Sequence, residues 1–94
     1  MNLVWTDTAI THLEAAWDYV KAASPAHAGA QLDRILDAAY NLVRFPDLGR
    51  RGRIPGTREL IIPDTPFLLA YRVRRSQIEI LAVLHGARRW PEKF

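Results

Sequence analysis

The sequence predicts an α+β fold in which an N-terminal strand and a two-helix antiparallel hairpin precede a three-stranded antiparallel sheet, in the order β-α-α-β-β-β. Three observations support this prediction. Apolar residues recur at helical spacing between residues 7 and 44. Apolar runs of strand length fill the second half and are separated by turn residues. The connections between these runs are short, and the 94 residues are expected to form one domain over positions 1–94.

The first half of the chain is predicted to form one strand and two helices. Leu3–Trp5 forms the strand, and Thr6 or Asp7 provides a helix N-cap because its side-chain oxygen can accept from a first-turn amide. This helix runs to about residue 23, where Ser24–Pro25 ends it and begins a second helix that runs to about residue 44. With almost no connection between them, the two helices are expected to pack as an antiparallel hairpin.

The second half is predicted to form three strands after a loop. Glycine and proline mark residues 50–56 as the loop. The strands span residues 57–62, 67–74 and 77–85. Their short connections make them antiparallel neighbours, with the helices covering one face of the sheet. The first of these strands is placed beside the N-terminal strand.

The composition excludes several classes of protein. The sequence has no cysteine, so disulfides and thiolate metal sites are not available, and no motif for a cofactor or a metal ion is present. Nothing resembles a signal peptide, and no apolar run reaches the ~18 residues that a membrane span needs. We therefore expect a cytoplasmic protein with no cofactor, no metal and no membrane partner.

The charge is distributed unevenly along the chain. Residues 1–48 carry three basic and six acidic side chains, whereas residues 49–94 carry ten basic and four acidic ones, and nine of these ten are arginine. The planar arginine fork suits phosphate and carboxylate groups. The partner is therefore expected to be polyanionic, either nucleic acid or an acidic protein segment, and the alternative is a basic surface that serves solubility.

Strict alternation along the last two strands predicts a common surface for several polar residues. In residues 77–85 the face expected to pack on the helices holds Ile78, Ile80, Ala82 and Leu84. His85 then lies on the opposite face, and the mixed face of residues 67–74 carries Arg72. Arg58 begins the neighbouring strand. Our hypothesis is that these three side chains share one open surface, close to Arg88, Arg89 and Trp90.

These residue types suit metal-independent cleavage of RNA with the 2′-hydroxyl as nucleophile. Arginines bind phosphates and stabilise developing charge. Histidine, with an ordinary pKa near ~6.5, transfers protons, and tryptophan stacks on unpaired bases. The candidate catalytic residues are Arg58, Arg72, His85 and Arg88. The candidate substrate-binding residues are Arg50, Arg51, Arg53, Arg89 and Trp90.

Each candidate also has a structural interpretation. His85 at a strand end can be a hydrogen-bonded structural residue, and Arg72 can pair with Glu59 or Glu79 across the sheet. The arginines of residues 50–53 can be solvated, and Trp90 can close an edge of the core. The helical histidines have no partner at metal-ligand spacing and are expected on the surface; they are His12 and His27.

An ordered set of short motifs runs through the chain. It comprises Ala9…Leu13…Trp17…Tyr19-Val20, Ser24-Pro25…Ala28, Leu42…Phe45-Pro46…Leu48-Gly49-Arg50, Gly56-Thr57-Arg58-Glu59-Leu60, Tyr71-Arg72-Val73 and Ile78…Ile80-Leu81…Val83-Leu84-His85…Arg88…Trp90. At these spacings, in a chain this short, the set resembles the RelE/ParE superfamily of toxins from type II toxin–antitoxin systems.

The resemblance implies a compact α+β toxin that is neutralised by a cognate antitoxin. In RelE-like members a basic concave sheet cleaves mRNA in the ribosomal A site. By motif, Arg58 and Arg72 are similar to the cleft arginines of those members, His85 to a histidine found in several of them, and Arg88–Arg89 to the arginine region that follows. ParE-like members share the fold, lack a ribonuclease site and inhibit DNA gyrase.

Two positions depart from the ribonuclease pattern that the resemblance implies. Trp90 lies near the position where active ribonucleases carry a functional tyrosine or another aromatic residue, and an indole cannot shuttle a proton as a phenol can. The lysines ahead of the first cleft strand are absent, with the arginines of residues 50–53 in their place. The sequence favours ribosome-associated mRNA cleavage. The alternatives are gyrase inhibition and an inactive protein that only binds the antitoxin.

Overall fold

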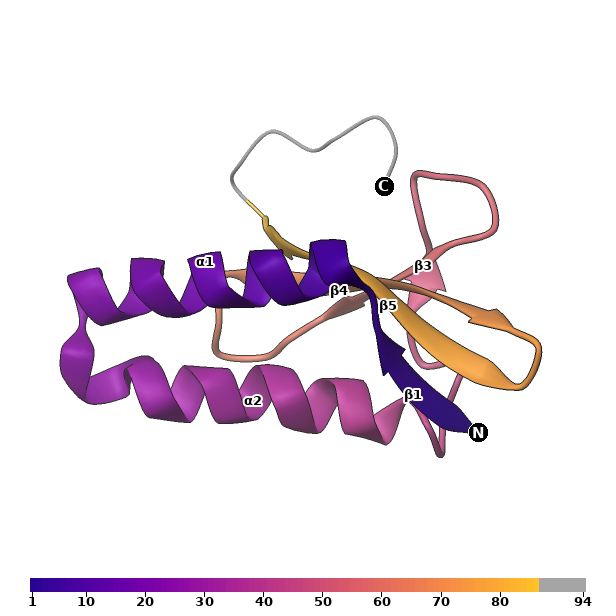
Figure 1. Cartoon of the computed structure of the whole chain (residues 1–94), viewed down its shortest axis with the longest axis horizontal. Coiled ribbons are helices and arrows are strands. Elements are labelled where there is room, and N and C mark those ends of the chain that lie inside the picture. The colour runs from indigo at the N-terminus through magenta and orange to yellow at the C-terminus, as the bar shows by residue number, and fades with distance from the viewer. Residues whose placement is uncertain (87–94) are drawn as a thin grey trace.

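The computed structural model describes residues 1–86. Its elements are β1 (Asn2–Trp5), α1 (Asp7–Ala23), the 3-10 turn η1 (Pro25–His27), α2 (Ala28–Asn41), β2 (Arg50–Arg51), β3 (Arg58–Ile61), β4 (Phe67–Arg74) and β5 (Gln77–His85). The two helices lie side by side and antiparallel (Figure 1). The predicted α+β class and helical hairpin are confirmed, although the second helix begins with a 3-10 turn and ends near residue 41.

The strands of residues 1–86 form a five-stranded sheet in the order β1-β5-β4-β3-β2. β1 runs parallel to β5, and the other neighbours are antiparallel. The N-terminal strand therefore pairs with the last strand, so its predicted place beside the strand that follows the helices is wrong. β5 is buried along most of its length, and a strand of that kind takes a central place with neighbours on both sides.

Two residues of the predicted loop at 50–56 form the short edge strand β2. Arg50 pairs with Glu59, and Arg51 pairs with Arg58. The Glu59 carboxylate, which is only 4% exposed, accepts from the backbone N–H of Arg53 at 2.8 Å and from Arg50 Nη2 at 3.3 Å. A buried carboxylate requires such partners, and these contacts hold the segment against β3.

Helix α1 closes the edge of β5 that β1 leaves uncovered. The hydroxyl of Thr6 accepts from the Ala9 amide at 3.2 Å, which caps the helix, and donates to the Ile80 carbonyl at 2.8 Å. One turn further on, His12 Nδ1 accepts from the Val83 amide at 3.3 Å. The side chains of α1 thus satisfy backbone groups that an open sheet edge would leave exposed.

The sheet is apolar on both faces. The larger cluster lies between the helices and one face, and its largest fully buried side chains are Tyr71, Ile35, Leu42, Ile62, Leu69, Ile78 and Ile80. A smaller buried cluster lies on the other face, which we call the open face: Leu68, Ala70, Ala82 and Leu84. Within residues 1–86, no helix is both long enough and apolar enough to cross a membrane.

A β-bulge in β5 reverses the alternation of its side chains. Ala70 pairs with Ala82, but the next residue, Tyr71, pairs with Ile80, so Leu81 is an extra residue between the two pairs. Beyond the bulge, Val83 joins the helix-side cluster, while Ala82 joins the open-face cluster. The predicted helix-facing placement of Ala82 and Leu84 is therefore wrong, because an inserted residue shifts every later side chain to the opposite face.

Candidate functional site

Arg72 lies on the open face, opposite Glu79 in the neighbouring strand. Its Nε donates a hydrogen bond to Glu79 Oε1. This hydrogen bond is the main reason that the pKa of Glu79 lies below its usual value, and the charges of Arg72, Arg74 and Arg75 act in the same direction. Of the two carboxylates that the sequence offered to Arg72, the structure selects Glu79.

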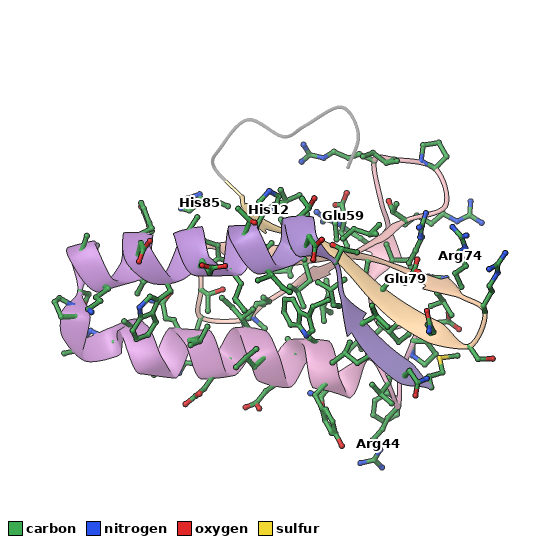
Figure 2. The ribbon with its side chains drawn as sticks, in the orientation of Figure 1. His12, Arg44, Glu59, Arg74, Glu79 and His85 are labelled. Carbon is green, nitrogen blue, oxygen red and sulfur yellow. The ribbon has the colours of Figure 1, made fainter. Side chains whose placement is uncertain are left out.

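His85 lies on the helix side of the sheet, not on the open face. It pairs with Phe67 across the strands, and its ring packs edge-on against Phe67 and against Tyr19 of α1, with centroid distances of 5.6 and 5.4 Å. The prediction that Arg72 and His85 share a surface is therefore wrong, because the bulge turns His85 over. Figure 2 shows His85 beside α1, far from Glu79 and Arg74.

The two residues are also far apart along the sheet. His85 is opposite Phe67, and Arg72 lies five positions further along β4. At about 3.3 Å per strand residue, the separation along the strand is about 17 Å. No small reacting group can contact both side chains at once.

Arg58 has a structural environment on the helix side. It pairs with Tyr71 across β3 and β4, so both side chains point toward the segment that follows α2. Arg58 Nη1 donates to the Gly49 carbonyl at 2.8 Å, and Nη2 lies 3.5 Å from Asp47 Oδ1. The guanidinium therefore anchors residues 47–49 to the sheet and lies on the face opposite to Arg72.

Tyr71 completes the anchoring of this segment. Its hydroxyl donates to the Pro46 carbonyl at 2.7 Å and accepts from the Gly49 amide at 2.8 Å. Burial raises the pKa of Tyr71, so the phenol remains a hydrogen-bond donor at neutral pH. A Cβ at position 49 would lie 2.6 Å from the Tyr71 ring, so only glycine fits there. No local sequence pattern indicates this contact, which joins residues 22 positions apart.

The remaining predicted residues divide into two groups. Arg50 and Arg53 are held at β2 by the buried Glu59, and Arg51 is exposed on the same short strand. Three predicted residues lie outside the part of the chain that the structure describes: Arg88, Arg89 and Trp90. Among residues 1–86 no group of three or more potential metal ligands lies close together.

The open face carries a pocket of about 550 Å³, which we call the open-face pocket. It lies between the first turn of α1, the tip of the β2–β3 hairpin, and strands β4 and β5. It is lined by Thr6, Thr8, Ile54, Pro55, Gly56, Thr57, Arg72, Val73, Arg74 and Leu81. Of the predicted site residues in this list, Arg72 alone contributes. Arg74 shares its face by simple alternation and could have been found from the sequence, whereas the bulged Leu81 could not.

His12 was expected on the surface, and this expectation is wrong. It is partly buried against β5, and burial lowers its pKa, consistent with a neutral ring that accepts from Val83. A local signal for this position existed. His12 is three residues after Ala9 and four before Ala16, both of which are buried, so it flanks the apolar stripe of α1.

The fold and this site are those of a small basic α+β protein of the RelE/ParE type, with Arg72 and Arg74 on the open face of its sheet. Residues 3–90 match the family described as the ParE toxin of the type II toxin–antitoxin system, parDE. The chain therefore belongs to the ParE toxin family, and the predicted RelE/ParE superfamily is confirmed. It is the toxin of a type II toxin–antitoxin system, and a cognate antitoxin is its partner.

Similar proteins agree with this family. The toxin-named protein Y4kP of Sinorhizobium fredii is 38% identical over 88 residues, which cover 94% of this chain and 91% of that protein. Toxin RelE2 of Caulobacter vibrioides is 32% identical over 87 residues, covering 93% and 97%. A chain from the solved chromosomal ParDE system of P. aeruginosa is 30% identical, with a TM-score of 0.82 and coverage of 90% and 95%.

Proposed function

We propose that this toxin arrests growth by inhibiting DNA gyrase, without a ribonuclease activity of its own. The observation that carries the proposal is the separation of Arg72 from His85, which lie on opposite faces of the sheet. Membership of the ParE family supports the same choice. The sequence alone favoured mRNA cleavage because it placed these two residues together.

Ribonuclease chemistry needs an acid–base group and arginines that face the same phosphate, and His85, Arg58 and Arg72 do not meet at one point in this structure. A general acid or base must come within about 3 Å of the proton that it transfers, and arginines that stabilise the transition state must face the same phosphate. Here His85 packs between two aromatic rings, and Arg58 points into the segment after α2. Inhibition by binding requires only a complementary surface, which a basic half-chain can supply to a DNA-bound enzyme.

One observation favours ribosome-associated mRNA cleavage as a second candidate. A relative that carries the name toxin RelE2 is 32% identical over nearly the whole chain. In that case the acid–base group would be a residue other than His85.

The test applies the purified toxin to purified gyrase in a supercoiling assay and, in parallel, to translating ribosomes with mRNA ends mapped by primer extension. We expect loss of supercoiling, restored when the cognate antitoxin is added first, and unchanged transcripts. New mRNA ends within codons, combined with full gyrase activity, would reject gyrase as the target.

A further inference from the structure

The connection between α1 and α2 carries a hydrogen-bonded pair of residues, Ser24 and His27, which we call the serine–histidine pair. The Ser24 hydroxyl oxygen lies 2.6 Å from His27 Nδ1. In the neutral tautomer that carries its proton on Nε2, Nδ1 is an acceptor, so the hydroxyl donates to the imidazole. A serine whose hydroxyl donates to a histidine has the arrangement in which the imidazole activates a nucleophile.

The Ser24 hydroxyl is not used to cap the helical turn that follows it. A serine at this position ordinarily accepts a hydrogen bond from an amide of the first turn. Ser24 makes no side-chain bond of this kind, and the His27 amide donates to the Ser24 backbone carbonyl at 3.0 Å. The backbone thus supplies the bonds that close this turn, and the hydroxyl remains available to the imidazole.

The serine–histidine pair is open to reagents from solvent. Ser24 is partly exposed, and the three residues that follow it are exposed. The side chains at positions 22, 23 and 26 are alanines, which leave the approach to the hydroxyl unobstructed. A small electrophile can therefore reach the Ser24 oxygen without displacing a large side chain.

This pair is also separate from the open-face pocket. Figure 1 shows the α1–α2 connection at the end of the helical hairpin that lies away from the β4–β5 turn. Helix α1 begins at the pocket, which Thr6 and Thr8 line, and its 17 residues span about 25 Å. A reaction at Ser24 therefore takes place far from Arg72 and Arg74.

The local charge is compatible with attack by an oxygen nucleophile. Negative charge develops on the carbonyl oxygen and on the leaving group during acyl transfer, and a nearby carboxylate would oppose it. Residues 21–32 contain one side chain with a formal charge, and it is the positive Lys21, three residues before Ser24. The charge of this segment therefore favours the transition state of acyl transfer.

We propose that Ser24 is a modification site that takes an acyl group from an activated acyl donor, with His27 as its general base. The Ser24 oxygen attacks the carbonyl carbon of the donor while its proton passes to His27 Nδ1. The bond between that oxygen and the acyl carbon forms, and the bond to the leaving group breaks, so the leaving group departs with the electron pair. The imidazolium then releases its proton to water, and the product is an O-acyl serine.

The experiment treats the full-length toxin with p-nitrophenyl acetate, a small activated ester, and locates the acetyl group by mass spectrometry of proteolytic peptides. The chain supplies its own reference, because its other serine, Ser76, is an exposed residue of the β4–β5 turn. His27→Asn places an amide oxygen near the position of Nδ1, so it keeps a hydrogen-bond acceptor but cannot take up a proton. Ser76→Ala is the matched control, and circular dichroism verifies that each variant is folded.

We expect Ser24 to be acetylated about tenfold or more faster than Ser76, which is less than the full effect of a general base in an enzyme site. His27→Asn should lower the Ser24 rate to that of Ser76, because a merely structural hydrogen bond would survive this change. Ser76→Ala should leave the Ser24 rate unchanged. Equal acetylation of the two serines, or an unchanged Ser24 rate in folded His27→Asn, would overturn the proposal.

The inference does not depend on gyrase being the target. The supercoiling assay contains no acyl donor, so its result reports on the proposed function alone. If Ser24 is acetylated no faster than Ser76 while supercoiling is still inhibited, the modification site is rejected and the gyrase proposal stands. Selective acetylation of Ser24 with full gyrase activity gives the reverse conclusion.

Discussion

Replacing His85 with phenylalanine separates a packing role from a catalytic one. The imidazole packs edge-on against Tyr19 and Phe67, with ring centroids 5.4 and 5.6 Å away, and a phenyl ring can reproduce this geometry. Edge-to-face aromatic pairs contribute about 0.5–1.5 kcal/mol each. The contribution of these two ring contacts to the free energy of unfolding should therefore be retained to within about 1 kcal/mol in His85→Phe. In His85→Ala it should fall by about 1–3 kcal/mol as both contacts are lost.

The toxicity of the His85→Phe variant distinguishes a packing role of His85 from a catalytic one. We expect His85→Phe to arrest growth as the wild type does when induced without antitoxin, and to inhibit gyrase at the same concentration. A general acid or base contributes about 10²–10⁴-fold to a rate, so the loss of such a group from a ribonuclease would be plain in the growth assay. Thermal melts should show a shift of about 4–8 °C per kcal/mol in a domain of this size. A folded His85→Phe protein with toxicity reduced about 100-fold or more would refute the packing role.

Two further predictions concern stability. Tyr71→Phe removes the hydroxyl that joins Pro46 and Gly49. Leaving the buried Gly49 amide and the partly buried Pro46 carbonyl unpaired should lower the free energy of unfolding by about 1–3 kcal/mol, measured by urea denaturation. Burial lowers the pKa of His12 from its ordinary value of 6.5, so the unfolded chain binds the proton more readily than the folded chain. The stability that neutral His12 provides should be complete above about pH 6.5 and decline as the pH falls toward the folded-state pKa. Urea denaturation at a series of pH values checks this, and equal pH dependence in His12→Gln would contradict it.

Much of the fold could be predicted because its signals are local. Three features depend only on the types of adjacent residues, and all three occur in the structure: the Thr6 cap, the Ser24–Pro25 break and the turn at Arg75–Ser76. At the turn both residues have positive φ, 52° and 61°, as a tight two-residue hairpin requires. The β2 strand was missed because it depends on a buried carboxylate at Glu59, which lies outside the segment itself.

The candidate site was less predictable because its residues meet only through the sheet. The sequence placed three candidate residues on neighbouring strands correctly, but it assigned them to one common face, which is wrong: Arg58, Arg72 and His85. Arg58 and His85 face the helices and Arg72 faces the opposite side. The pocket that Arg72 does line is completed by Thr8 and Ile54, whose positions follow from the paths of α1 and the β2–β3 hairpin.

By itself, the sequence determined the kind and order of the elements, the basic second half and the toxin superfamily, because periodicity, turn chemistry and composition are properties of neighbouring residues. Only the tertiary structure decided the strand order and the direction in which His85 points. The physical reason lies in the run from Ile80 to Leu84, which is buried on both faces of the sheet. When every side chain in a strand is apolar, an extra residue such as Leu81 leaves no trace in the hydrophobic pattern. That single residue places His85 and Arg72 on opposite faces of the sheet.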